Sequence, residues 1–195
     1  VKPVVIAVGH NEPDPYYKDS LASNARLITG DLTDAHFLEN LPQADYMIHA
    51  AGYSAPGRFL SNPVATLKLN TVSTFSLLEK LKLNGKFLFI SSSEVYSGSK
   101  NIPHREDDIG LTNTMHKRSC YIEGKRCGEA ISFAFRNQGL AVKAARASLV
   151  YGPGTKKNDQ RVLNEFIFKA LNGNITLMDA GEAKRTYCYV TDIVE

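Results

Sequence analysis

A tyrosine and a lysine stand four residues apart at the start of a predicted helix. Tyr121 and Lys125 belong to the segment SCYIEGKR, and the apolar residues after it predict a helix over 119–137. An α-helix repeats every ~3.6 residues, so both side chains project from one face, close enough to interact. An ammonium near a phenol favours the phenolate and lowers a tyrosine pKa from its usual value of about 10, which makes the tyrosine a usable general base.

The same spacing recurs at Tyr96 and Lys100, with a different local composition. Residues 97–99 are Ser, Gly and Ser, which favour a turn, so no helix aligns these two side chains. The spacing alone therefore also fits an ordinary surface pair on a helix. The rest of the chain must show whether Tyr121 and Lys125 form a catalytic pair.

Length and composition exclude several classes of protein. The 195 residues suffice for one domain or slightly more, and a net charge of +3 with dispersed lysines indicates no nucleic-acid surface. The sequence shows no bilayer-spanning apolar run and no signal-peptide pattern, so we expect a cytoplasmic protein that contacts no membrane. Three cysteines make an incomplete disulfide framework and no Cys/His spacing suggests zinc, so we expect free thiols and no metal.

Short apolar runs alternate with helical segments along the chain. Strands are predicted near 4–8, 26–29, 46–52, 86–90 and 141–149, with helices starting near Thr33 or Asp34 and over 61–83 and 119–137. This alternation predicts an α/β fold, a doubly wound parallel sheet covered on both faces. Ligands bind beyond the carboxyl ends of such strands. Asp31, Ala50, Ser91 to Glu94 and Tyr151 would lie there.

The amino-acid composition of the chain changes after Gly152. A Gly/Lys/Asn loop precedes a predicted helix over about 159–171, a short strand at 175–177 and the start of another helix at 190.

Several ordered motifs resemble those of one family, the extended short-chain dehydrogenases/reductases that work on nucleotide-activated sugars. They are Gly30-Asp31-Leu32, His49 to Gly52, Ser91 to Tyr96, the Tyr121/Lys125 pair, Tyr151-Gly152-Pro153, Arg185 and Tyr189 to Asp192. Within the family, 120–126 and 158–167 look most like the UDP-glucuronate decarboxylases.

The resemblance implies a catalytic set. Tyr121 would remove the proton of the sugar 4-hydroxyl as hydride leaves C4 for NAD, and Lys125 would assist Tyr121 and hold the nicotinamide ribose. Ser92 would hydrogen-bond the reacting oxygen, Ser93 would contact the substituent at C5, and Glu94 would orient the sugar or handle a C5 proton. The carboxylate of a glucuronate, β to the new ketone, would then leave as carbon dioxide.

It also implies binding residues, each with a simpler alternative. Asp31 and Leu32 would contact adenine, and Ala50 and Ala51 would line the cofactor, with Lys125 and Asn70 beside them. Arg185 would meet the substrate pyrophosphate, a bidentate task suited to guanidinium. Equally, Asp31 could cap a turn, Asn70 could serve helix packing, Arg185 could be a surface charge and Glu94 a strand-end residue.

The sequence departs from the family pattern in three places. No Gly-rich dinucleotide loop, with its strand and helix, precedes Val4, and a chain without that loop should bind NAD poorly. The family has an acidic residue that binds the adenosine ribose, and Gly9 and His10 stand near its place here. The choice between NAD and NADP therefore stays open. Leu149 stands where Asn is usual.

We therefore interpret 1–152 as a Rossmann-like dinucleotide-binding domain, incomplete at its N-terminus, and 153–195 as the beginning of a nucleotide-sugar-binding region, incomplete at its C-terminus. Ser93 stands where dTDP-glucose dehydratases have Asp, and it resembles the serine of decarboxylases and of GDP-mannose dehydratases, so it narrows the choice of reaction without deciding it. A 4-epimerase or 4,6-dehydratase, and a truncated non-catalytic fragment, remain alternatives. The resemblance also implies a homodimer, with 61–83 and 119–137 of each subunit forming a four-helix bundle.

Overall fold

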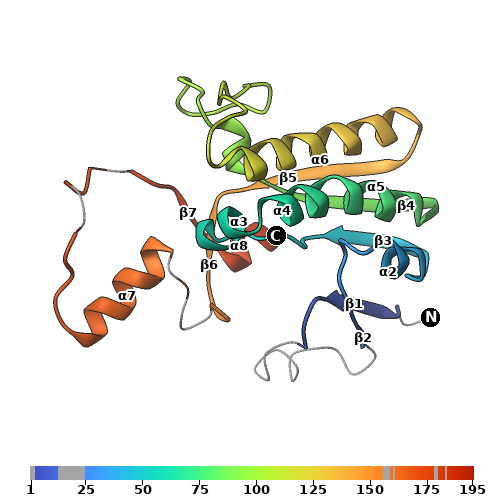
Figure 1. Ribbon diagram of the computed structural model, residues 1–195, viewed down its shortest axis with the longest axis horizontal. Helices are drawn as coiled ribbons and strands as arrows, with labels where there is room; N and C mark the ends of the chain where they lie inside the picture. Colours follow the sequence, from blue (N-terminus) through green and yellow to red (C-terminus); the bar gives the residue numbers. More distant parts are fainter. Residues whose placement is uncertain (1–2, 13–24, 156–158, 160, 178–179, 183) are drawn as a thin grey trace. The chain divides into compact units, whose positions relative to one another are not determined.

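The chain divides into two units, Val1–Arg146 and Ala147–Glu195. The computed structural model describes residues 3–12, 25–155, 159, 161–177, 180–182 and 184–195 (Figure 1). The loop predicted over 11–24 lies largely outside the described residues. The functional division at residue 152 stays a prediction.

Apolar runs in the first unit form the predicted parallel strands. Strand β1 (Val5–Gly9) pairs with β2 (Ala25–Thr29), and β3 (Ala44–His49) pairs with β4 (Leu81–Ser92), both in parallel. Strand β5 (Ala141–Ala147) is the other neighbour of β4. Parallel strands alternating with helices confirm the predicted α/β class.

The strands of this unit form two sheets, not the single sheet that the sequence predicts. Among the described strands, β1–β2 is separate from β3–β4–β5. In a doubly wound sheet of order 3-2-1-4-5-6, the strand that carries the Gly-rich loop lies between these two groups. No Gly-rich loop stands between Val1 and β1.

One face of the β3–β4–β5 sheet is covered by helices. Helices α4 (Pro63–Asn70) and α5 (Val72–Glu79) follow each other end to end over it, and α6 (Ser119–Asn137) runs beside them (Figure 1). The opposite face of β3 stays exposed, with Tyr46 at 72% and Ile48 at 71%, so the expectation of cover on both faces is wrong for the part of the chain that the structure describes.

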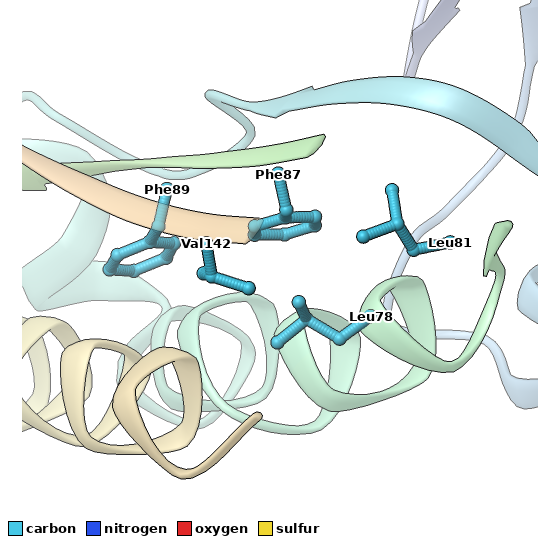
Figure 2. Close-up of a cluster of buried hydrophobic side chains, with 5 residues drawn as sticks. All are labelled: Leu78, Leu81, Phe87, Phe89 and Val142. Carbon is cyan, nitrogen blue, oxygen red and sulfur yellow. The ribbon is translucent and has the colours of Figure 1, made fainter. Parts of the chain in front are cut away.

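The core of the unit lies between that sheet and the helices. Figure 2 shows its main cluster, in which two strand phenylalanines meet apolar side chains from α5 and from β5. The buried members are Leu78, Leu81, Phe87, Phe89 and Val142. A second cluster joins α2 (Ala35–Glu39) to α4, and its buried members are Leu32, Leu38, Leu41 and Leu69.

The single helix predicted over 61–83 is wrong. A short helix, α3 (Pro56–Ser61), precedes it, and the helix itself is broken at Thr71, whose φ of −116° and ψ of −77° interrupt the regular turn. It also ends at Glu79, because Leu81 already pairs with Ala44 of β3 and packs into the core. Tertiary pairing here overrides a helical sequence pattern.

Two local predictions match closely. Helix α6 has the predicted bounds of 119–137. The side chain of Asp34 caps α2 by accepting hydrogen bonds from the amides of His36 and Phe37, so one of the two predicted caps is confirmed. All three cysteines, Cys120, Cys127 and Cys188, have free thiols, as expected.

The second unit contains a two-stranded parallel sheet and two helices. Strand β6 (Leu149–Tyr151) pairs with β7 (Tyr187–Tyr189), which leads into α8 (Val190–Val194). Helix α7 covers Val162–Asn172, close to the prediction. The predicted fifth strand ends at Ala147, with β6 as a separate strand.

The strand predicted at 175–177 is wrong, because these residues have no regular structure and Ile175 and Leu177 are about half exposed. Across the described residues, no helix is long and apolar enough to cross a bilayer.

Close approach of α6 to its neighbours depends on a glycine. A Cβ at Gly128 would lie 2.7 Å from the carbonyl oxygen of Asn70 and would overlap the ring of Phe89. Both neighbours are fully buried and have little room to move. We therefore expect Gly128→Ala to lower the free energy of unfolding by about 1–2 kcal/mol, since overpacking outweighs the better helix propensity of alanine.

Urea denaturation measures this effect, and Gly57→Ala in α3 is the matched control. A Cβ at Gly57 meets nothing within 4 Å, so that variant should unfold at an unchanged or higher urea concentration. Equal behaviour of the two variants would show that the Gly128 contact is not tight.

Candidate active site

The predicted tyrosine lies in the first turn of α6, packed against α3. Tyr121 is 8% exposed, and its ring stacks on Phe59 with centroids 4.8 Å apart and planes 14° from parallel. Phe59 is itself buried. Stacking on a buried ring restricts the orientation of the phenol and therefore presents it in one direction.

The predicted lysine is buried one turn further along the same helix. The Lys125 ammonium lies 5.9 Å from the centroid of the Tyr121 ring and donates a hydrogen bond of 2.7 Å to the carbonyl of Ile90. Burial lowers the pKa of Lys125 to about 8, and the carboxylate of Glu129 opposes that shift. The structure thus brings the two residues together on one helix face, as predicted.

An unsatisfied polar atom lies beside this lysine. Asn70 is completely buried, and its amide nitrogen donates to the carbonyl of Thr66 at 2.8 Å. Its Oδ1 atom has no hydrogen-bond partner among the described residues. A Cβ at Gly52 would lie 3.9 Å from both Asn70 Oδ1 and Lys125 Nζ, so the glycine, the amide oxygen and the ammonium border one polar spot.

The segment after β4 carries three more predicted residues. Ser92 ends the strand, is 8% exposed and accepts a 3.2 Å hydrogen bond from the amide of Glu94. Ser93 and Glu94 begin the 3-10 turn η1 (Ser93–Tyr96) and are half-buried. The Glu94 carboxylate forms an ion pair of 2.7 Å with Arg118, so it is more than a strand-end residue.

Helix α6 fixes this segment at successive points. Besides the Lys125 contact with Ile90, the guanidinium of Arg126 donates to the carbonyl of Val95 at 2.9 and 3.0 Å. One turn later, Glu129 accepts a short hydrogen bond from the hydroxyl of Ser91. The helix that bears the Tyr121/Lys125 pair therefore also sets the position of residues 92–94.

Glu129 is held in turn by an arginine of β5. Arg146 makes a bidentate contact with its carboxylate, with a closest distance of 2.7 Å, and also donates to the hydroxyl of Tyr96 at 2.9 Å. These bonds raise the pKa of Arg146, so the guanidinium stays charged. Tyr96, the tyrosine of the second Tyr/Lys spacing, is thus a structural partner of Arg146.

The residues predicted to contact adenine and line the cofactor lie at the ends of β2 and β3. The Asp31 carboxylate caps a turn by accepting the amide of Thr33 at 2.8 Å, and this bond lowers its pKa. The side chain of Leu32 is buried in the second core cluster. Ala50 is exposed and Ala51 packs against that cluster. Capping by Asp31 is therefore real, and its role toward a cofactor stays a prediction.

Arg185 belongs to the second unit. It is exposed, and its guanidinium donates to the carbonyl of Lys184 at 2.8 Å. Leu149, a departure from the pattern of the family that the sequence resembles, is half-buried in β6 of the same unit. The predicted role of Arg185 remains a prediction.

A buried histidine contributes no charge to the site. His49 at the end of β3 is 3% exposed, and its Nε2 lies 3.0 Å from the carbonyl of Leu69. Burial lowers the pKa of His49 to about 4, so the ring is neutral at neutral pH and its Nε2 donates to that carbonyl. Charge near the phenol therefore comes from Lys125 rather than from the imidazole.

The sequence did not single out Phe59, Arg118 or Glu129, although all three contact predicted residues. Glu129 follows Lys125 by four residues and Arg118 precedes Tyr121 by three, so helix spacing could have indicated both. Phe59 lies 62 residues from Tyr121, and no local pattern connects them.

Comparisons with known proteins agree with this arrangement. Residues 4–195 match the NAD dependent epimerase/dehydratase family. The chain is 36% identical over 174 residues to UDP-glucuronic acid decarboxylase 1 of Xenopus tropicalis, covering 88% of this chain and 40% of that protein. It is 37% identical over 172 residues to UDP-glucuronic acid decarboxylase 6 of Arabidopsis thaliana, covering 87% and 49%.

Solved structures show the same fold. The UDP-glucose 4-epimerase of Thermotoga maritima, determined with UDP-glucose, superposes with a TM-score of 0.80 at 26% identity and covers 97% of this chain and 62% of that chain. The chain thus spans about half or less of the length of the curated relatives above. The Tyr121/Lys125 pair, which the family resemblance implies to be catalytic, is buried. Because the family model matches residues 4–195, the chain belongs to the NAD dependent epimerase/dehydratase family.

Proposed function

We propose that this protein is an NAD-dependent nucleotide-sugar enzyme that oxidises the sugar at C4 and decarboxylates UDP-glucuronate. The observation that carries the proposal is the buried pair on α6, in which the Lys125 ammonium lies 5.9 Å from the Tyr121 ring beside an unsatisfied amide oxygen. The relatives at 36% and 37% identity, both UDP-glucuronic acid decarboxylases, support the choice of substrate.

The residues beside Lys125 fit a bound dinucleotide. Asn70 Oδ1 is a buried acceptor without a partner among the described residues, and a hydroxyl or amide donor of a ligand would satisfy it. The absence of a side chain at Gly52 leaves that spot open. Lys125 and Asn70 would hold the nicotinamide half, and Asp31, Leu32, Ala50 and Ala51 the adenine half and the adjoining wall. NAD supplies a hydride acceptor when bound, and NADP stays an alternative.

Tyr121 acts as the general base toward the sugar 4-hydroxyl. The ammonium of Lys125 favours the phenolate form of Tyr121, because opposite charges stabilise each other strongly where water is excluded. Phe59 keeps the ring in one orientation, so the phenol oxygen does not have to be reoriented before each proton transfer.

Ser92, Ser93 and Glu94 are proposed to contact the sugar at C4 and C5. Ser92 hydrogen-bonds the reacting oxygen, Ser93 contacts the C5 substituent and Glu94 orients the sugar. A carboxylate β to a ketone loses carbon dioxide without needing an acid to protonate a leaving hydroxyl. The uncharged Ser93, in place of the Asp of a dehydratase, suits that reaction.

A 4-epimerase is the second candidate, favoured by the superposition on the UDP-glucose 4-epimerase of Thermotoga maritima. Both reactions share Tyr121, Lys125 and the ketone at C4. An assay of the full-length protein with NAD separates them: carbon dioxide from UDP-glucuronate supports the decarboxylase, and interconversion of UDP-glucose with its C4 epimer supports the epimerase. If neither product forms, the non-catalytic fragment becomes the better interpretation.

Arg185, a residue of the second unit, is proposed to bind the pyrophosphate of the substrate. Guanidinium matches two phosphate oxygens at once, and the exposed side chain is reachable by a ligand.

Replacing Tyr121 by Phe should abolish turnover in the full-length protein and leave NAD affinity within about threefold. The substitution removes the proton acceptor and keeps the stacked ring, so the loss in kcat should exceed about a hundredfold. Steady-state kinetics and NAD titration measure the two effects. Near-normal turnover of this variant would refute the mechanism.

Replacing Lys125 by Met should abolish turnover and, at pH 7, raise the free energy of unfolding by about 1–3 kcal/mol, since an apolar group replaces a buried charge. The folded pKa of about 8 lies below that of an exposed lysine, so the wild-type protein gains stability as pH rises from about 8 to about 10.5. The advantage of the variant should therefore be greatest below pH 8 and vanish near pH 10.5.

Chemical denaturation of both proteins from pH 7 to pH 10.5 tests this. A constant difference across the range would show that Lys125 is not destabilised by burial.

A homodimer is proposed through α4, α5 and α6. Large apolar side chains are exposed on the first two helices, namely Val64, Leu67, Val72 and Phe75, and Ala130 and Ala134 are exposed on α6. These helices pack against one another, with Phe75 contacting Phe135 edge-on at 5.3 Å. Two copies of such a pair would form a four-helix bundle that covers these side chains.

Light scattering should give twice the protomer mass for the full-length protein. Ala134→Glu, which puts a charge on the exposed face of α6, should shift the protein toward monomer, and a monomeric wild-type protein would contradict the bundle.

A further inference from the structure

Arg118 lies immediately before α6 and connects that helix to the segment after β4. Its Nη2 atom is 2.7 Å from Oε1 of Glu94, and the two side chains are 29% and 32% exposed. Its carbonyl accepts the amide of Tyr121 at 3.0 Å, which starts the helix. The residue is therefore anchored by its backbone to Tyr121 and by its side chain to Glu94.

The guanidinium of Arg118 is also held against an aromatic ring. Its central carbon lies 5.1 Å from the centroid of Phe59, the same ring that stacks on Tyr121. Phe59 is 1% exposed, so the surface beneath the guanidinium is fixed. A planar cation resting on a fixed ring keeps its position, which a lysine ammonium would not do equally well.

The position matters because of the charge of the sugar. In the proposed reaction Tyr121 acts at C4, and the carboxylate of a glucuronate is attached to the adjacent carbon, C5. Glu94 follows Ser93, the residue proposed to contact that substituent. Two carboxylates in one partly buried site repel each other, so an unpaired Glu94 would disfavour an acidic sugar.

Arg118 has the charge and the donors to reverse this effect. A guanidinium offers five N–H donors, and the hydrogen bond to Glu94 uses one of them, at Nη2. Lys125, the other cation near the phenol, is buried and donates to the carbonyl of Ile90. The partly exposed Arg118 is thus better placed to meet an incoming anion.

We propose that Arg118 determines specificity for a sugar that carries a carboxylate at C5, by neutralising Glu94 and donating hydrogen bonds to that carboxylate. This inference rests on the proposed function and deepens it, since it assigns a recognition residue for the acidic sugar. Arg118 is a specificity-determining residue here, and Tyr121 remains the proton acceptor.

Calorimetric titration of the full-length protein with UDP-glucuronate and with UDP-glucose tests the proposal, in the presence of NAD. The two nucleotides differ at C5, where one has a carboxylate and the other a hydroxymethyl group. Arg118→Met should weaken UDP-glucuronate binding by about tenfold or more, the size expected for a lost charged hydrogen bond, and UDP-glucose binding by less than about threefold. Arg118→Lys should give an intermediate loss.

Lys117→Met is the matched control, since it removes one positive charge from the adjacent, exposed residue. It should leave both affinities within about twofold. Equal weakening of both nucleotides by Arg118→Met would assign Arg118 a purely structural role and overturn the proposal, as would unchanged binding of UDP-glucuronate.

Failure of the proposed function has a different signature. A wild-type protein that binds UDP-glucuronate without releasing carbon dioxide would rule out the decarboxylase and leave the selectivity of Arg118 measurable. A wild-type protein that binds UDP-glucose but not UDP-glucuronate would overturn both.

Discussion

The hydrogen bond from the Lys125 ammonium to the carbonyl of Ile90 is the contact on which the site depends. The ammonium of a lysine that is 6% exposed needs an acceptor, and a carbonyl near the end of β4 provides one at 2.7 Å. The bond fixes α6 along β4 at the level where Ser92 ends the strand. Because Tyr121 is one turn from Lys125, the same bond determines the height of the phenol above the sheet.

That contact requires α6 to approach its neighbours closely, and two small residues make this possible. Gly124 and Gly128 are four apart, so they share the helix face that meets Asn70 and Phe89. A side chain at either position would push the helix outward and lengthen the Lys125 contact. Stability and function therefore both rest on the tight packing of α6, although burying Lys125 itself costs free energy.

Much of this arrangement was predictable from local pattern, and the errors have physical causes. The bounds of α6 and the capping of α2 by Asp34 depend on short-range chemistry, and the sequence predicts both. The break at Thr71 and the early start of β4 are not predicted, because pairing with β3 and core packing of Leu81 decide them. Likewise, helix spacing predicts the Tyr121/Lys125 pair, whereas the Phe59 stack joins residues far apart in sequence.

Within the first unit, the fixed helix α6 and the segments beside it suggest how one proposed chemistry can serve several reactions. The proposed proton removal at C4 would use Tyr121 and Lys125, which lie on a helix of the first unit whose position is set by its own packing. In the proposed reaction, the fate of the ketone would depend on the groups around C5, which we propose to include the Glu94/Arg118 pair in the segments beside that helix. A change in those segments can alter the charge that the sugar meets without moving α6. Relatives that decarboxylate and relatives that epimerise are then expected to share the helix and to differ around it.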